Sequence, residues 1–205
     1  MACLPRSLFE RSALQVARDL LGCCLVRMKS GRRLSGIIVE TEAYQGEEDQ
    51  ACHARAGRTP RTEVMYGPPG HAYIYFTYGM HWLLNAVVEP EGFPAAVLLR
   101  SITAVENVEE MARYRPSLAN TKHWTDGPAK LTQALDLDGR LNGCDLCDPS
   151  GELFIEAASQ VLPDDQVETG PRVGLFTVPE PWKSVPWRFQ VRIKNLEFRI
   201  SNGFF

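Results

Sequence analysis

The stretch ETEAY, residues 40–44, holds two carboxylates and a phenol that could act together on one substrate. It directly follows the apolar run IIV, which predicts a β-strand, and alternate residues of a strand share one face at a spacing of about 6.5–7 Å. Glu40, Glu42 and Tyr44 would therefore point the same way. A carboxylate held in a pocket could remove a proton from an attacking water, with the ring as a stacking platform. The alternative is a solvated strand face whose glutamates only aid solubility.

Arg100 and Asn85 lie in stretches that otherwise predict buried strands. Arg100 ends the run AAVLLR, and because an unpaired buried charge is costly, it needs a partner such as the glutamates of ETEAY. Asn85 interrupts the run LLNAVV and is either a hydrogen-bonded structural amide or a group directed at a ligand. For both residues a structural and a functional interpretation stay open.

The long polar loop after residue 45 carries one histidine and three arginines, namely His53, Arg55, Arg58 and Arg61. The net charge of −3 argues mildly against a nucleic-acid partner, but screening confines charge effects to about 10 Å. Between residues 50 and 88 only Glu63 opposes the arginines, so this part of the chain is positive. The arginines could bind phosphates through their charge and forked donors, or they could be solvated loop charges.

The segment YIYFTYGMHW, residues 73–82, crowds aromatic residues around one glycine. Its alternation predicts two strands joined by a two-residue turn at Gly79 and Met80, of the mirror-image type that favours glycine. Tyr78, Met80 and His81 would then lie at or beside the tip, where most soluble proteins place small polar residues or lysine. The hairpin is either a core element or a finger that contacts a partner.

These segments belong to a chain of mostly short strands with few helices. Apolar spacing predicts a helix over residues 11–21, the stretch 105–115 predicts another, and 120–147 predicts a helix plus a loop. Strands are predicted at 24–29, 34–44, 72–88, 94–102, 151–157, 171–178 and 187–201. This order predicts an α+β fold, with residues 1–205 as a single domain that has a mostly antiparallel, curved sheet, surrounding helices and a protruding hairpin.

Composition narrows the class of protein. Of the 205 residues 44% are hydrophobic and 23% charged, as in ordinary globular proteins. No run approaches the roughly 20 apolar residues of a membrane span, and the N-terminus lacks the apolar region of a signal peptide, so we expect a cytoplasmic protein without membrane contact. Cys144 and Cys147 could form half of a zinc site, but the sequence has no second Cys or His pair with suitable spacing. We therefore expect no metal.

The string ETEAY…HAR…RTPR…YIYFTYGMHWLLNAV…VLLR resembles the alkyladenine (3-methyladenine) DNA glycosylase family. The likeness continues through GPAKLTQAL and PRVG to PWRF and so covers nearly the whole chain. It implies that Glu42 is the general base that activates water and that Arg100 helps to position this water. A backbone carbonyl in the last strand, matched at Val191, would also hold the water. No cofactor is implied.

The resemblance also implies a base pocket. Tyr44 and Tyr75 would sandwich an extruded base, with His53 closing the pocket. Asn85 would crowd the position of an exocyclic amino group and so disfavour guanine.

The hairpin tip would then contact the duplex. Tyr78 would be inserted into the minor groove in place of the flipped nucleotide, which explains an exposed ring on a finger. Further residues expected at the DNA are Met80, His81, Arg55, Arg58 and Arg61.

The function implied is excision of alkylated or deaminated purines (3-methyladenine, 7-methylguanine, hypoxanthine, ethenoadenine) from double-stranded DNA in base excision repair, by a monomer near the bacterial nucleoid. No lysine lies between Val39 and Ser101 to form a Schiff base, so we expect a monofunctional hydrolase that leaves an abasic site. Two alternatives stay open: a catalytically silent damage-binding protein and a hydrolase of free nucleosides.

Overall fold

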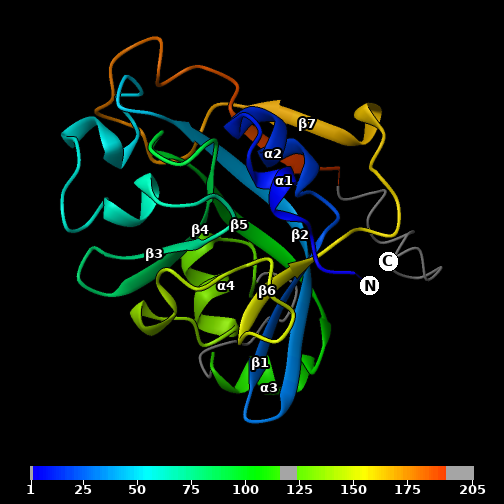
Figure 1. The fold of residues 1–205 in the computed structure, drawn as a ribbon. Coiled ribbons are helices and arrows are strands. Elements are labelled where there is room, and N and C mark those ends of the chain that lie inside the picture. The colour runs from blue at the N-terminus through cyan, green and yellow to red at the C-terminus, as the bar shows by residue number, and fades with distance from the viewer. Residues whose placement is uncertain (1, 116–123, 193–205) are drawn as a thin grey trace.

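The computed structural model describes residues 2–115 and 124–192, which form one curled antiparallel sheet with helices packed against it (Figure 1). Six strands follow the order β3-β4-β5-β2-β1-β6, and β8 joins this sheet through β2 while β7 pairs with β8. The strands are β1 (Cys24–Lys29), β2 (Arg32–Gln45), β3 (Ala72–Thr77), β4 (His81–Val88), β5 (Ala95–Glu106), β6 (Leu153–Glu156), β7 (Val167–Gly170) and β8 (Arg188–Val191). The predicted α+β architecture with a mostly antiparallel sheet is confirmed.

The helices are short. They are α1 (Arg6–Phe9), α2 (Ala13–Asp19), α3 (Val108–Arg113) and α4 (Pro128–Ala134), with 3-10 turns at His53–Ala56, Glu63–Tyr66, Gly139–Leu141 and Asp164–Gln166. The α2 helix begins after Ser12, whose hydroxyl accepts a hydrogen bond from the Gln15 N–H and so satisfies one of the unpaired amides of the first turn. It packs on β2 and β5, and α4 packs on β4 and β5. None of the described helices is long and apolar enough to span a bilayer.

The strand β2 is the centre of the fold because it pairs with three others, β1, β5 and β8. Its register with β5 shifts on either side of Glu40, where the chain has a bulge-like irregularity. Such irregularities bend a strand and redirect side chains, and they are common beside functional sites. The two glutamates of ETEAY therefore lie where the sheet is locally bent.

The β3–β4 hairpin projects from the edge of the sheet, as predicted (Figure 1). Its turn differs from the prediction: Thr77 pairs with His81, so three residues rather than two form the tip. Tyr78 and Gly79 both have positive φ, and the Met80 N–H donates to the Thr77 carbonyl, as in a mirror-image turn followed by one extra residue. The predicted turn at Gly79 and Met80 was wrong because it left out Tyr78, since a tyrosine rarely adopts the left-handed region.

Other boundaries also differ. The stretch 171–178 is a loop, not a strand, because the Val173 N–H binds a side chain and Gly174 has a φ of +82°. The strand β7 was not predicted, since VETG lacks an apolar alternation. The predicted strand 187–201 contains β8, and its part from residue 193 onward lies outside the described residues, as does the beginning of 120–147. That residues 1–205 form a single domain stays a prediction.

Candidate functional site

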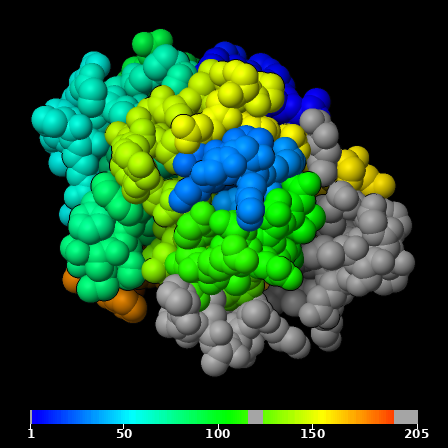
Figure 2. All heavy atoms as spheres, turned by 90° about the horizontal axis from the view of Figure 1, so that it is seen from below, coloured from blue at the N-terminus to red at the C-terminus, as the bar shows by residue number. Residues whose placement is uncertain are grey.

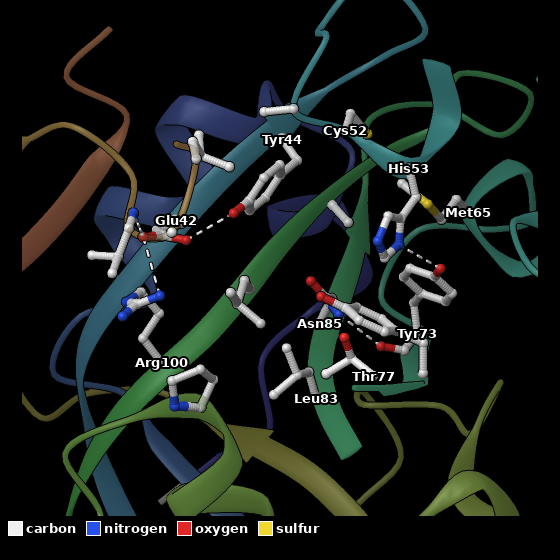
Figure 3. Close-up of a pocket in the computed structure, with 18 of the residues that line it drawn as sticks. Glu42, Tyr44, Cys52, His53, Met65, Tyr73, Thr77, Leu83, Asn85 and Arg100 are labelled. Atoms are coloured by element: carbon white, nitrogen blue, oxygen red, sulfur yellow. Dashed lines mark hydrogen bonds and ion pairs between the residues drawn. The ribbon is translucent and has the colours of Figure 1, made fainter. Parts of the chain in front are cut away.

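A cavity of about 360 Å³ opens between β2, the β3–β4 hairpin, β5 and the loop that follows β7 (Figure 3). This volume is within the usual range of small-molecule sites. A small apolar cluster that includes Cys52, Met65 and Tyr73 lines part of it, and Tyr44 and Tyr75 pack against this cluster. In Figure 3, Tyr44 and His53 lie on either side of the cavity.

Glu42 is the buried acid of this cavity, with no exposed surface. Its Oε1 accepts a hydrogen bond from the Val173 N–H at 2.7 Å and lies 3.2 Å from Nη1 of Arg100. Its Oε2 accepts a hydrogen bond from the Tyr44 hydroxyl at 2.8 Å. Burial raises the pKa of Glu42, and Arg100 and the two hydrogen bonds offset this effect only in part. The carboxylate is therefore a stronger base than a solvated glutamate.

Arg100 has the carboxylate partners expected for an arginine at the end of a buried strand. Its Nε lies 3.1 Å from Glu40 Oε1, in addition to the contact with Glu42. Glu40 is also paired with Nη1 of Arg188 at 3.0 Å. Arg188 belongs to β8, where it pairs with Glu42 in the sheet register. Two acids and two arginines from three adjacent strands thus form one charge network beside the cavity.

Tyr75 and His53 form the aromatic wall of the cavity. The ring centroids of His53 and Tyr75 are 4.4 Å apart at an interplanar angle of 74°, and His53 Nδ1 is 3.0 Å from the Tyr73 hydroxyl. Burial, with Arg61 and Arg55 nearby, lowers the pKa of His53 to about 4. The imidazole is therefore neutral at physiological pH.

The pKa of His53 gives a stability prediction. A histidine whose pKa falls from 6.5 to about 4 on folding binds its proton more tightly when unfolded, so its contribution to stability is present above pH 6.5 and is lost as the pH falls toward 4. We expect the free energy of unfolding of the parent protein to fall more steeply across this window than that of His53→Gln. Denaturant titrations at several pH values measure both, and parallel curves would contradict the burial of a neutral imidazole.

Asn85 is both a hydrogen-bonded structural amide and a residue that faces the cavity. Its Nδ2 donates to the Tyr73 carbonyl at 3.0 Å, and the residue also lines the cavity. Its side chain is therefore held by the neighbouring strand while it faces the space where a ligand would bind.

The hairpin tip is the most exposed apolar part of the site. Tyr78 is 84% exposed and Met80 67%, whereas His81 is half-buried. Strand parity predicts that Tyr75 and Tyr78 face opposite ways, but the tip is not a strand, and both residues border the cavity. Tyr78 lies at its mouth. A non-glycine residue at a φ of +52° costs free energy, and such strain is typical of functional sites.

The three arginines of the polar loop have different surroundings. Arg58 forms two hydrogen bonds with the carboxylate of Glu63, and Arg55 donates to the Gln50 carbonyl. Arg61 lies over the ring of Tyr75, with its guanidinium carbon 5.1 Å from the centroid. Of the three, Arg61 has a direct contact with a residue of the cavity.

Val191, the residue expected to hold the water with its carbonyl, is not opposite Glu42 in the sheet. The residue opposite Glu42 in the sheet register is Arg188, and Val191 lies three residues further along β8, opposite Val167 of β7. The side chain of Val191 is buried in the main core. Val173, in the loop after β7, donates its N–H to the Glu42 carboxylate instead. The only signal for it in the sequence was the PRVG segment, and nothing in the spacing linked this segment to ETEAY. Among the described residues no cluster of three or more potential metal ligands occurs.

A family model and several relatives match nearly the whole chain. The family model described as methylpurine-DNA glycosylase matches residues 7–195. A relative from Methanocella arvoryzae is 46% identical over 189 residues, which cover 92% of each chain. Relatives from Carboxydothermus hydrogenoformans (42% identical, 92% of this chain and 95% of the relative) and Streptomyces avermitilis (44%, 92% and 87%) are similar. All three relatives carry the same name, "Putative 3-methyladenine DNA glycosylase".

Proposed function

Because this chain belongs to the methylpurine-DNA glycosylase family, a DNA-repair family, we propose that it flips damaged purines out of duplex DNA and hydrolyses their N-glycosidic bonds at this cavity. The observation that carries the proposal is one arrangement: the buried carboxylate of Glu42 lies in a cavity whose mouth is bordered by the exposed ring of Tyr78. A carboxylate is the group that glycoside hydrolysis requires, and an exposed ring fits the gap left in a base stack.

The contacts of Glu42 leave one acceptor site of its carboxylate for the attacking water of the proposed reaction. A carboxylate has about four acceptor sites, two on each oxygen. Val173 and Arg100 occupy Oε1, while Tyr44 takes one site of Oε2. The remaining site of Oε2 can accept a hydrogen bond from a water and then its proton as this water attacks the deoxyribose carbon. The guanidinium of Arg100 lies beside the same carboxylate and would help to orient the water.

The rings of the cavity suggest the substrate class. A purine stacked between Tyr44 and Tyr75 would be favoured when it is cationic, as 3-methyladenine and 7-methylguanine are, because aromatic faces attract positive charge. Such bases also leave without strong protonation. Hypoxanthine and ethenoadenine are expected neutral substrates, and Asn85 would crowd the amino group of normal guanine.

The outer surface suggests how the duplex is held. Flipping costs a few kcal/mol, least at damaged or mispaired sites. Tyr78 would fill the vacated position, with Met80 and His81 beside it. Arg61 and the neighbouring arginines, Arg55 and Arg58, would attract the phosphates.

The absence of an amine supports a monofunctional reaction. None of the described residues that line the cavity is a lysine, so no side-chain amine is available there for a Schiff base with the sugar. A monomeric state and a cytoplasmic location remain predictions.

A direct test uses duplex oligonucleotides that each contain one hypoxanthine, ethenoadenine or 7-methylguanine. We expect strand cleavage only after alkali treatment, because the enzyme leaves an intact backbone at an abasic site. Cleavage without alkali would contradict the monofunctional reaction. Release of bases from free nucleosides at the same rate would favour the nucleoside hydrolase, and binding to damaged DNA without base release would favour the silent damage-binding protein.

A second exposed ring, that of Phe176, follows the residues Val173, Gly174 and Leu175 that line the cavity, and it is 84% exposed. In Figure 2, part of the loop after β7 (orange) is visible at the lower left edge of the molecule. We expect Phe176→Ser to weaken binding to duplex DNA about 5- to 10-fold, since one aromatic contact contributes roughly 1 kcal/mol. Val161 is equally exposed but does not line the cavity, so Val161→Ser is the matched control. Equal affinities of both variants would exclude Phe176 from the interface.

A further inference from the structure

Arg172 and Asp49 form an ion pair whose two side chains have no exposed surface. The pairing is two-pronged: Nη1 lies 2.5 Å from Oδ2, and Nη2 lies 2.9 Å from Oδ1. Paired hydrogen bonds of this kind define the orientation of both groups. Neither residue lines the cavity, so the mechanism above does not use them.

The pair connects the loop after β7 with a distant part of the sequence, namely the end of β2 and the polar loop that directly follows it. Nη1 of Arg172 also donates to the carbonyl of Ala43 in β2, at 2.9 Å, and Nη2 donates to the Trp182 carbonyl at 3.1 Å. Asp49 accepts hydrogen bonds from the backbone N–H groups of Gln45 and Ala51. The polar loop, the end of β2 and the loop after β7 are therefore joined at one point.

Two hydrogen-bond donors to the Glu42 carboxylate, Val173 and Tyr44, lie next to the Arg172–Asp49 ion pair. The residue after Arg172 is Val173, whose N–H donates to Glu42. The guanidinium carbon of Arg172 also lies 4.7 Å from the ring centroid of Tyr44, whose hydroxyl donates to the other carboxylate oxygen. On the opposite side, the Pro171 carbonyl accepts a hydrogen bond from Arg188 Nε at 3.0 Å. The two peptide groups that flank Arg172 are thus both hydrogen-bonded, the Pro171 carbonyl to Arg188 and the Val173 N–H to Glu42.

We propose that Arg172 and Asp49 are positioning residues for Glu42: the pair places the Val173 N–H and the Tyr44 ring so that the carboxylate stays ionised and aimed at the water. This inference rests on the proposed function, because it assigns the pair to the same reaction. A purely structural role is the alternative. Buried ion pairs are often no better for stability than apolar residues of the same volume, so stability alone does not explain the pair.

The test compares Arg172→Lys, the double variant Arg172→Met/Asp49→Leu, and the control Arg27→Met. Arg172→Lys keeps the charge that Asp49 needs but loses the paired geometry. The double variant removes both charges together, which avoids the cost of leaving one of them unpaired. Arg27 is another buried, ion-paired arginine, on β1 and outside the cavity, so its variant reports the loss of a buried guanidinium alone.

We expect single-turnover base release in Arg172→Lys and in the double variant to fall about 100-fold, as for a small misplacement of a catalytic group, with unchanged affinity for damaged duplex. Losing the Val173 hydrogen bond, which favours the ionised carboxylate, would raise the pKa of Glu42 further, so the acid limb of the pH–rate profile would move to higher pH. The control is expected to lose thermal stability but to keep the parent rate and profile.

Carbon NMR titration of the Glu42 carboxyl in DNA-free protein measures the same effect without activity. A folded double variant with the parent rate and an unchanged Glu42 pKa would overturn the proposal, and if that variant does not fold, Arg172→Lys decides by the same two measurements. If the parent protein releases no base, the proposed function fails, and the NMR titration alone decides whether the pair positions Glu42.

Discussion

Glu42→Gln is expected to slow base release from damaged duplex about 10²- to 10⁴-fold, the usual effect of removing a general base. The amide can still accept from the Val173 N–H and remain beside Arg100, so the shape of the cavity and the affinity for DNA should not change. Single-turnover assays and binding titrations with the same oligonucleotide measure the two quantities.

The thermal stability of Glu42→Gln at two pH values shows whether the variant folds normally. Burial raises the pKa of Glu42, so the folded protein binds this proton more tightly than the unfolded chain does. The contribution to stability is therefore full below the ordinary pKa of 4.5 and is lost as the pH rises through the raised value. Glutamine does not ionise, and we expect the variant to melt at a higher temperature than the parent at neutral pH and at a similar one below pH 4.5. A less stable variant would show that the ion pair with Arg100 outweighs the cost of burial.

Tyr78→Asn is expected to separate stability from activity. Tyr78 has a φ of +52° and is 84% exposed, so it pays for a left-handed conformation without making a packed core contact. Asparagine adopts this conformation more readily, and we expect the free energy of unfolding to rise by up to about 1 kcal/mol. Base release from duplex should fall about 10- to 100-fold, because one stacking contact contributes roughly 1–3 kcal/mol.

Tyr78→Phe is the matched variant, since it keeps the ring and loses only the hydroxyl. Its rate should be close to that of the parent protein. If Tyr78→Asn kept the full rate on duplex DNA, the ring would not fill the vacated position, and a hydrolase of free nucleosides would become the better interpretation. Chemical denaturation supplies the stability half of the comparison.

The sequence predicted the sheet well because local patterns determine it. The apolar segments CLVRMK and HWLLNAVV coincide with the observed bounds of β1 and β4. The need of Arg100 for a carboxylate partner also followed from local burial, and the two ion pairs confirm it. In each case the residues themselves, or their nearest neighbours in the chain, contained the information.

The parts that were missed depend on contacts between distant segments. Val173 reaches Glu42 across 131 positions, and Arg172 reaches Asp49 across 123, and no periodicity reports such distances. The match to Val191 required the last strand to place this residue opposite Glu42. In the observed register Arg188 is opposite Glu42. Likewise, a tyrosine with positive φ is not predicted from its neighbours, because its conformation opposes its intrinsic preference.

The central position of β2 affects how the site responds to thermal fluctuations. Glu42 lies on the strand that shares ladders with three others, so its amide is exposed to exchange only when most of the sheet opens. Tyr78 lies beyond β3, which is an edge strand with one partner, and this hairpin can fray while the rest of the molecule stays native. On warming, the proposed contact of Tyr78 with the duplex should therefore be lost before the surroundings of Glu42 are disrupted.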